Sequence, residues 1–246
     1  MITATFQEGS FRDKKVLVSG GTSGIGAAIG NALAELGAIV TVTGATEAEA
    51  TEANRGASIE RADALDVRDD TAVAAFFAAL PTLDVLINCA GIIRRGAEHD
   101  PAVFAEVLDD NLTGTMRLCA AARPLLARTH GCIVNTASLL AFVGGALVPG
   151  YSASKGGVAQ LTKSLAVAYA PDRIRVNAIA PGWIETELTR PLREDPVRNE
   201  AIVARTPLGR WGVADDVAGT AVFLCSPAAA FVTGAIIPID GGYLAA

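Results

Sequence analysis

The fold of this 246-residue chain is decided near its start, by Lys15-Val16-Leu17-Val18-Ser19-Gly20-Gly21-Thr22-Ser23-Gly24-Ile25-Gly26. The first five of these residues are mostly apolar and β-branched, which is typical of a strand buried on both faces. Residues 27–36 are rich in alanine and predict a helix that ends at Gly37, and residues 38–43 predict a second strand. Strand, glycine-rich turn, helix and strand together predict a βαβ unit.

The turn between the first strand and the helix suits a phosphate group. Glycine allows positive φ angles and lets a ligand approach the backbone closely. The free amides at the start of the helix, together with the helix dipole, attract a pyrophosphate. The spacing Gly20-x-x-x-Gly24-x-Gly26 differs from the common G-x-G-x-x-G dinucleotide pattern, so the turn by itself does not establish a nucleotide site.

The same alternation of strands and helices continues along the chain. Further strands are expected at 57–62, 83–87, 132–136, 174–179 and 235–239, and further helices at 71–79, 101–128, 151–169 and 213–224. This alternation predicts an α/β protein with a single Rossmann-type, doubly wound domain over residues 1–246. Its sheet is expected to be parallel, with seven strands and helices on both faces. Only the polar segment 185–206 breaks the rhythm, and we expect it to be an irregular loop of the kind that often forms a lid.

Composition and charge exclude several classes of protein. The net charge of −6 and the scattered basic residues argue against a nucleic-acid partner or a membrane surface. The long charge-free runs 131–154 and 217–239 are interrupted by glycine and proline, so neither predicts a membrane helix. Residues 1–15 lack an apolar secretory core, and we expect a cytoplasmic protein. The four cysteines show no metal-type spacing, so no metal site is expected.

Polar and glycine residues directly follow several predicted strands. Gly20, Asn88, Ser138 and Pro181 all do so, and ligands of open α/β sheets bind outside the carboxyl ends of the strands. A loop can return Tyr151-x-x-x-Lys155 to the same edge, where a phenol and an ammonium one helical turn apart can exchange a proton with an alcohol or carbonyl oxygen. A surface tyrosine beside a solvated lysine is the alternative interpretation of that spacing alone.

These residues resemble the short-chain dehydrogenase/reductase family over residues 12–246. The motifs that carry the resemblance occur in this order: Gly20-x-x-x-Gly24-Ile25-Gly26, Asn88-x-Ala90-Gly91, Asn111, Ser138, Tyr151-x-x-x-Lys155, Pro181-Gly182 and Asp240-Gly241-Gly242. Any one of them is weak, but seven in order are specific. The resemblance implies an enzyme that transfers a hydride between a nicotinamide cofactor and a secondary alcohol or ketone.

The resemblance also implies roles for single residues. Tyr151 is then the acid/base and Ser138 orients the substrate oxygen. Lys155 binds the nicotinamide ribose and lowers the pKa of Tyr151, and Asn111 holds a water that links Lys155 to solvent. Asp66 contacts the adenine and Thr186 the carboxamide. The full cofactor set implied in this way is Gly20, Thr22, Ser23, Gly24, Ile25, Gly26, Asp66, Val67, Asn88, Ala90, Gly91, Tyr151, Lys155, Pro181, Gly182, Ile184 and Thr186.

Two positions depart from the family pattern. Cys89 replaces the usual second asparagine, which matters little if Asn88 makes the cofactor contact. The segment after the second strand, 43–46, is neutral, whereas an acid there would accept hydrogen bonds from the ribose of NAD and an arginine would pair with the phosphate of NADP. Glu47, Glu49 and Glu52 follow, and the first basic residue is Arg55. We therefore expect NAD(H), with NADP(H) as the alternative.

Finer features resemble the sugar-acid dehydrogenases of this family, of the gluconate 5-dehydrogenase and 2-dehydro-3-deoxy-D-gluconate 5-dehydrogenase type. They lie at 90–95, 138–149 and 209–212. Arginines near a cleft can hold a carboxylate through two hydrogen bonds, so the candidate substrate residues are Arg94, Arg95, Ser138, Tyr151 and Trp183. A solvated or subunit-contact pair is the other interpretation of the two arginines.

Two other functions fit parts of the sequence. A 3-oxoacyl-[acyl-carrier-protein] reductase shares the motifs, but such enzymes generally use NADPH and offer a basic surface to an acidic carrier. A non-catalytic NAD-binding sensor or scaffold would keep the fold without the chemistry, and the intact Asn111, Ser138, Tyr151 and Lys155 argue against it. The family commonly forms tetramers through its long helices, so the resemblance also implies a homotetramer.

Overall fold

The chain forms one sheet of seven strands, in the order β3-β2-β1-β4-β5-β6-β7. The computed structural model describes residues 5–53 and 59–246. All pairings are parallel, which confirms the predicted fold class. The strands are β1 (Lys15–Ser19), β2 (Ile39–Gly44), β3 (Arg61–Ala64), β4 (Val85–Asn88), β5 (Cys132–Thr136), β6 (Arg175–Pro181) and β7 (Ile236–Ile239). The strand order reverses between β1 and β4, where open α/β sheets bind their ligands.

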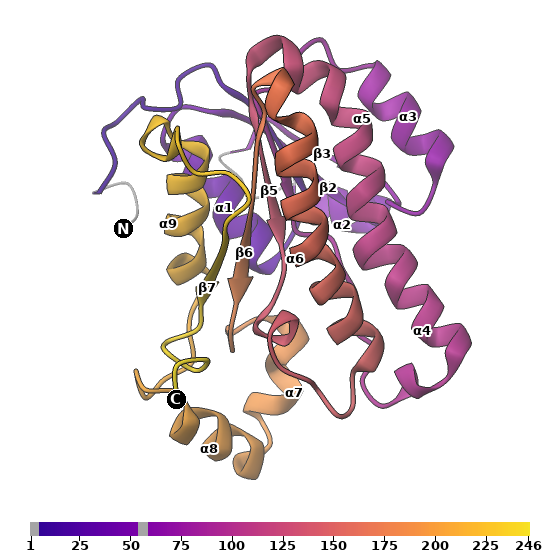
Figure 1. Cartoon of the computed structure of the whole chain (residues 1–246), viewed down its shortest axis with the longest axis vertical. Helices are drawn as coiled ribbons and strands as arrows, with labels where there is room; N and C mark the ends of the chain where they lie inside the picture. Colours follow the sequence, from indigo (N-terminus) through magenta and orange to yellow (C-terminus); the bar gives the residue numbers. More distant parts are fainter. Residues whose placement is uncertain (1–4, 54–58) are drawn as a thin grey trace.

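Helices cover both faces of the sheet because successive strand residues point to opposite sides (Figure 1). In β1, Val16 and Val18 join one buried cluster with α1 (Gly24–Glu35), α2 (Glu47–Ala53) and α9 (Ala214–Cys225). Leu17 joins the other cluster, with α3 (Asp70–Ala78), α5 (Gly114–Thr129) and α6 (Pro149–Tyr169). Each side thus has its own apolar core, and the polar residues at the strand ends remain at the sheet edge.

The helix expected over 101–128 is interrupted. Asp100 caps α4 (Pro101–Leu108) by accepting a hydrogen bond from the amide of Ala102 at 2.8 Å. A π-helical turn, η3 (Asp109–Thr113), then joins α4 to α5. Such turns insert one extra residue into a helix and are frequent at functional sites. The predicted strand 57–62 also differs, since β3 begins later; Arg55 and the first two residues of that prediction lie outside the described residues.

The expectation of an irregular loop over 185–206 is wrong. The segment contains a 3-10 turn, η6 (Glu187–Thr189), and two helices, α7 (Arg190–Arg193) and α8 (Pro196–Arg205). Asp195 starts α8 by accepting hydrogen bonds from the amides of Val197 and Arg198, and Pro196 supplies a fixed φ at the first position. We name residues 187–205 the α7–α8 segment. It lies beyond the carboxyl ends of the strands (Figure 1).

A small separate core fixes the α7–α8 segment. Leu192 and Ile202 pack on Trp211 there.

Further 3-10 turns are η2 (Ala97–His99), η4 (Leu139–Ala141), η5 (Ala170–Asp172) and η7 (Pro227–Ala229). Of the helices in the described part of the chain, none has the length and apolar character needed to cross a membrane.

Candidate active site

Two cavities meet at the carboxyl edge of the sheet. The glycine cleft, of about 410 Å³, extends from the turn after β1 to Tyr151 and Lys155. The arginine cavity, of about 330 Å³, is lined by Ser138, Tyr151, Arg95 and Arg205 among others. Tyr151 and Leu188 line both cavities, so the phenol stands at their junction.

The turn after β1 leaves backbone amides facing the glycine cleft. Gly20 has a φ of 67°, and a Cβ placed on it would lie 2.5 Å from the amide nitrogen of Ala90. A Cβ on Gly26 would lie 2.2 Å from the carbonyl oxygen of Gly20. Ser23 precedes α1, but its side chain makes no capping hydrogen bond, so the first amides of α1 stay available. The turn therefore fits the pyrophosphate of a dinucleotide.

Most of the cofactor residues expected from the sequence come together in the glycine cleft. Those that line it are Gly20, Thr22, Ser23, Gly24, Ile25, Gly26, Asp66, Val67, Ala90, Gly91, Tyr151, Lys155 and Thr186. Four others do not line it. Gly182 lies at the arginine cavity, Pro181 is buried in β6, and Ile184 forms a bridge to Gly212.

Asn88 is the fourth residue outside the cleft, against the expectation that it faces the cofactor. Its side chain points into the core, where Nδ2 donates to Oδ1 of Asn135 at 2.8 Å and contacts Sγ of Cys119 at 3.3 Å. Asn135 in turn donates to Oγ1 of Thr162 at 2.9 Å. Alternation along the strand explains the difference, because the next residue, Cys89, faces the cleft instead.

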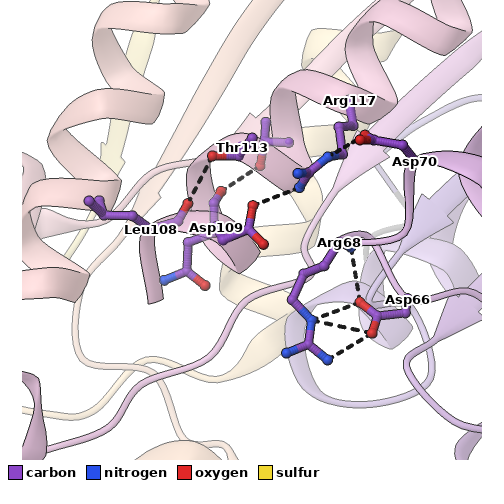
Figure 2. A network of polar contacts seen from close by, with 9 residues as sticks. Asp66, Arg68, Asp70, Leu108, Asp109, Thr113 and Arg117 are labelled. Atoms are coloured by element: carbon purple, nitrogen blue, oxygen red, sulfur yellow. Dashed lines mark hydrogen bonds and ion pairs between the residues drawn. The ribbon is translucent and has the colours of Figure 1, made fainter. Parts of the chain in front are cut away.

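A network of ion pairs includes Asp66 and Arg68, which line the glycine cleft (Figure 2). Arg68 donates to both carboxylate oxygens of Asp66, with Nη2 at 2.7 Å from Oδ2, and this hydrogen bonding lowers the pKa of Asp66. Arg117 connects Asp70, at 2.6 Å, with Asp109, at 2.9 Å. Since Asp109 starts the π-helical turn, Arg117 fastens that turn to the start of α3.

Glu49 returns from α2 to the mouth of the glycine cleft. Its Oε2 accepts a hydrogen bond from the amide of Ala45 at 2.9 Å, and Gly44, Ala45 and Glu49 all line the cleft. Gly44 makes room for this arrangement, because a Cβ there would lie 2.7 Å from Oε2 of Glu49. A carboxylate thus occupies the side of the cleft that follows β2, where the sequence alone shows a neutral segment.

Lys155 is buried beneath Tyr151. Its Nζ donates to the carbonyl oxygen of Thr136 at 2.7 Å and lies 5.5 Å from the centre of the Tyr151 ring. Burial disfavours the charged ammonium and lowers the pKa of Lys155 to about 8. A lysine with this pKa can hold or release a proton near neutral pH.

The pKa of Tyr151 is raised, mainly because burial disfavours the phenolate. A hydrogen bond with the Ser138 side chain opposes the shift, Glu98 adds to it, and Arg95 opposes it. Arg95 is therefore one positive charge that acts against the shift. The ammonium of Lys155 donates to Thr136, and the lowering of the Tyr151 pKa by Lys155 that the resemblance implies stays a prediction.

Asn111 stands in the π-helical turn and is fully buried. Its Oδ1 accepts from the amide of Ile92 at 2.7 Å, and its Nδ2 donates to the carbonyl of Ile92 and to Oγ of Ser154, both at 3.0 Å. A Cβ on Gly91 would lie 3.0 Å from Oδ1 of Asn111 and 3.6 Å from Nζ of Lys155. Gly91 therefore packs against both side chains. The water that the resemblance implies between Asn111 and Lys155 stays a prediction.

The arginine cavity brings together two arginines from distant parts of the chain. Arg95 follows β4, and Arg205 ends α8 with its guanidinium 4.2 Å from the centre of the Tyr243 ring. Neither forms an ion pair within residues 5–53 and 59–246. Arg94, also expected here, lies outside the cavity and pairs with Glu106 at 3.1 Å.

Trp183 lines the arginine cavity as expected, with its ring 5.8 Å from that of Trp211. The sequence did not reveal Arg205 or Tyr243 as neighbours of Ser138. Their only signal was the position of Arg205 in the segment expected to form a lid. Arg68 was missed too, although its place two residues after Asp66 suits a short-range ion pair.

The arrangement can exchange a proton beside a bound dinucleotide. The phenol of Tyr151 lies between a cleft with free amides and a cavity with a hydroxyl group and two arginines that form no ion pair with the described residues. An alcohol bound near Ser138 can give its proton to Tyr151. Lys155 lies next to the Tyr151 ring, and Asn111 and Lys155 both lie close to Gly91. The comparisons with known proteins agree with this chemistry.

A family model described as Enoyl-(Acyl carrier protein) reductase matches residues 20–244. The chain is 45% identical to 2-dehydro-3-deoxy-D-gluconate 5-dehydrogenase of Bacillus subtilis strain 168, over 96% of each chain. Its structure resembles one described as a gluconate dehydrogenase of Agrobacterium tumefaciens, with a TM-score of 0.92, 33% identity, and coverage of 98% of this chain and 100% of the other.

A second Agrobacterium tumefaciens structure, described as a 2-deoxy-D-gluconate 3-dehydrogenase with bound NADP, is 43% identical, with a TM-score of 0.87 and coverage of 98% of this chain and 100% of the other. The similarity covers nearly the full length of the chain, and the family match spans both the glycine turn and the tyrosine–lysine pair. The chain therefore belongs to the short-chain dehydrogenase/reductase family, and it is a nicotinamide-dependent oxidoreductase that moves a hydride between the cofactor and a secondary alcohol or ketone.

Proposed function

We propose that the chain interconverts a secondary hydroxyl group and a ketone on a sugar acid, with Tyr151 as the acid/base. The observation that carries the proposal is the position of Tyr151 at the junction of the glycine cleft and the arginine cavity. A cofactor in the first and a carboxylate-bearing substrate in the second would meet at its phenol. The catalytic residues we propose are Asn111, Ser138, Tyr151 and Lys155.

In the oxidative direction Tyr151 takes the hydroxyl proton of the substrate while Ser138 holds the same oxygen by a hydrogen bond. When bound, the nicotinamide supplies the hydride acceptor. Lys155 and Asn111 then return the tyrosine to its starting state, because a lysine with a pKa of about 8 can pass a proton on near neutral pH. In the reductive direction Tyr151 gives its proton to the ketone oxygen.

The substrate class follows from the two unpaired arginines. A guanidinium binds a carboxylate through two parallel hydrogen bonds, and Arg95 and Arg205 line the same cavity as Ser138. The names of the relatives, 2-dehydro-3-deoxy-D-gluconate and gluconate dehydrogenases, point to the same class of substrate. An acyl-carrier substrate fits less well, because the chain carries a net charge of −6.

For the cofactor we propose NAD(H). The carboxylate of Glu49 lies beside Gly44 and Ala45, on the side of the cleft that follows β2. It would accept hydrogen bonds from the ribose hydroxyls of NAD and repel the additional phosphate of NADP. The Agrobacterium tumefaciens structure described as a 2-deoxy-D-gluconate 3-dehydrogenase contains NADP, so a preference for NAD(H) would distinguish this chain from that protein.

We also propose a cytoplasmic homotetramer. Met116 on α5 and Val167 on α6 are exposed apolar residues on the two long helices through which the family commonly associates. The four cysteines are free thiols, which suits a reducing compartment. Light scattering of the purified protein tests the assembly: a mass of four chains is expected, and a monomer at all concentrations contradicts it.

The decisive experiment compares wild type with Tyr151→Phe on a panel of sugar acids, simple ketones and 3-oxoacyl thioesters. Turnover of a sugar acid by wild type is expected, with a loss of about a hundred- to ten-thousandfold in the variant, since general acid/base catalysis is commonly worth 10²–10⁴. Binding of the nicotinamide, followed by fluorescence, should not change. Turnover retained in Tyr151→Phe would exclude the mechanism, and turnover of thioesters alone would exclude the substrate class.

Cofactor choice is tested by dissociation constants rather than turnover. Wild type is expected to bind NAD⁺ more tightly than NADP⁺. Glu49→Gln should reduce the ratio of the two dissociation constants about tenfold, because it removes one negative charge near the additional phosphate of NADP⁺. Glu47→Gln is the matched control: it makes the same change on the same helix, at a residue outside the cleft. Equal binding of both nucleotides by wild type would refute the preference.

A further inference from the structure

We propose that Glu98 is a positioning residue, which holds the backbone of Tyr151 and the segment that carries Arg95 in one fixed relation. The inference rests on the proposed function, since it assumes that Tyr151 is the acid/base. Glu98 itself lines neither the glycine cleft nor the arginine cavity.

One buried carboxylate binds two segments. Glu98 lies in η2 and is 1% exposed. Its Oε2 accepts a hydrogen bond from the amide of Tyr151 at 2.8 Å, and its Oε1 accepts one from the amide of Arg94 at 2.8 Å. Hydrogen bonds from amides to a carboxylate are short and strong. The start of α6 and the segment after β4 are thereby joined through a single side chain.

The start of α6 depends on this distant residue. Val148 precedes the helix and supplies no capping hydrogen bond, so the amide of Tyr151 finds its acceptor in Glu98, 53 residues away. Gly150 leaves space for the carboxylate, since a Cβ there would lie 3.3 Å from its Oε2. A negative charge at a helix start is also favoured by the helix dipole. The hydrogen bond thus fixes the direction in which α6 begins and the position of Tyr151 in its first turn.

The same charge acts on the chemistry. Glu98 forms no ion pair with the described part of the chain, so its carboxylate is balanced by backbone amides rather than by a cation. The ionisable groups that face Tyr151 are Glu98 from η2, Arg95 from the segment after β4 and Lys155 from α6. The negative charge of Glu98 acts to raise the pKa of Tyr151, and it acts in the same direction on the pKa of Arg95. The positive charge of Arg95 acts to lower the pKa of Tyr151.

The test is Glu98→Gln in the full-length enzyme. The amide keeps one oxygen acceptor but turns its NH₂ group toward the other backbone amide, so one of the two hydrogen bonds is lost. We expect kcat/KM to fall about ten- to a hundredfold, the size of effect that a displacement of about 1 Å produces. We also expect the ionisation of Tyr151, and with it the acid limb of the kcat/KM profile for oxidation, to move to lower pH, because a negative charge is removed.

The ionisation is read without substrate. The chain has three tyrosines, so the near-ultraviolet absorbance of tyrosinate is titrated in Glu98→Gln and in the same variant with Tyr151→Phe added, and the difference belongs to Tyr151. Glu98→Asp keeps the charge but is too short to reach both amides. It should lose kcat/KM while leaving the midpoint of Tyr151 near its wild-type value, and it serves where Glu98→Gln does not fold.

The control for a purely structural cap is Asp69→Asn. Asp69 caps α3 by accepting from the amides of Thr71 and Ala72 at 2.9 Å, and it lies outside both cavities. This variant should lower the melting temperature and leave the acid limb unchanged. If Glu98→Gln and Glu98→Asp both keep the wild-type kcat/KM and the wild-type midpoint of Tyr151 ionisation, as Asp69→Asn is expected to do, the inference is overturned. Turnover by Tyr151→Phe would instead overturn the proposed function.

Discussion

The glycine cleft and the arginine cavity share Tyr151 but are built from different material. The glycine cleft includes two glycine-containing backbone turns: Gly20, Gly24 and Gly26 in the turn after β1, and Ala90 and Gly91 after β4. The arginine cavity is walled by side chains from the segment after β5, from the α7–α8 segment and from the chain end. The turn after β1 depends on backbone geometry, whereas the charge of the arginine cavity depends on the identity of its side chains.

This difference separates what the two cavities can tolerate. Every nicotinamide dinucleotide presents the same pyrophosphate, so a backbone turn suits them all. A methyl group added at Gly20 or Gly26 would meet main-chain atoms, which cannot move aside as the end of a flexible side chain can. Substrates differ in length and charge, and a cavity of side chains can change without disturbing the sheet. Substitutions at Gly20 and Gly26 should therefore damage stability and cofactor binding together, whereas replacement of Arg95 or Arg205 in the arginine cavity should alter substrate affinity alone.

The largest effect is expected from Gly26→Ala. The new Cβ would lie 2.2 Å from the carbonyl oxygen of Gly20, so the turn must shift. We expect the free energy of unfolding to fall by about 3 kcal/mol or more, with loss of detectable nicotinamide binding. Urea unfolding measures the first and nicotinamide fluorescence the second.

Gly30→Ala is the control in the same helix. Its Cβ would make ordinary contacts of 3.5 Å and longer with Val42, Val40 and Val18, and alanine favours a helix over glycine by about 1 kcal/mol. This variant should be as stable as wild type or more so. If Gly26→Ala and Gly30→Ala bind the nicotinamide equally well, the backbone account of the glycine cleft fails.

Lys155 lines the glycine cleft beside Tyr151, and its burial predicts a smaller effect on stability with a definite pH dependence. Its pKa is lowered from 10.5 to about 8, so between these values the unfolded chain binds more protons than the folded one. The free energy of unfolding therefore rises with pH through this window, and the buried ammonium costs about 3 kcal/mol at pH 7. Loss of the hydrogen bond to Thr136 offsets part of the gain in Lys155→Met.

At pH 7 we therefore expect Lys155→Met to have a free energy of unfolding about 1–2 kcal/mol higher than wild type, measured by urea unfolding. The variant should lose turnover. The variant should also lose most of the rise in stability between pH 8 and 10.5. Lys163→Met, an exposed position on the same helix, should change stability by less than about 0.5 kcal/mol. Lower stability of Lys155→Met at every pH would show that the ammonium is well accommodated.

The two cavities also differ in how far the sequence could predict them. The sheet, its parallel direction and the glycine cleft depend on local patterns: apolar strands, the glycine spacing and polar residues at strand ends. Those patterns correctly placed Gly20, Gly26, Thr186 and Lys155 at one edge. Asn88 was misplaced because the sequence shows where a strand ends but not which face its last side chain takes.

The rest depends on contacts between distant segments. Glu98 meets the amide of Tyr151 across 53 residues, and no local pattern marks an acid that caps a helix elsewhere in the chain. The α7–α8 segment looked irregular because its helices are short and their apolar residues, Leu192 and Ile202, find their partner only in Trp211. Arg205 was missed for the same reason, since its neighbours are fixed by tertiary packing.

Arg205 gives the smallest and most selective test of the arginine cavity. Tyr243 holds its guanidinium at 4.2 Å from the ring centre, so the charge is already in place for a carboxylate. Arg205→Gln should raise KM for D-gluconate or its 2-oxo-3-deoxy analogue about tenfold, or about 1.4 kcal/mol, and leave KM for the uncharged hexitol unchanged.

The matched control is Arg123→Gln. Arg123 also lies over a tyrosine ring, that of Tyr169 at 4.5 Å, but it is remote from both cavities and pairs with Asp172. It should leave both KM values unchanged, which separates the loss of a stacked arginine from the loss of a charge at the substrate. Equal increases for the acid and the hexitol in Arg205→Gln would mean that Arg205 shapes the cavity without binding the carboxylate. Arg95 would then be left, among the described residues that line the cavity, as the cation that confers a preference for sugar acids.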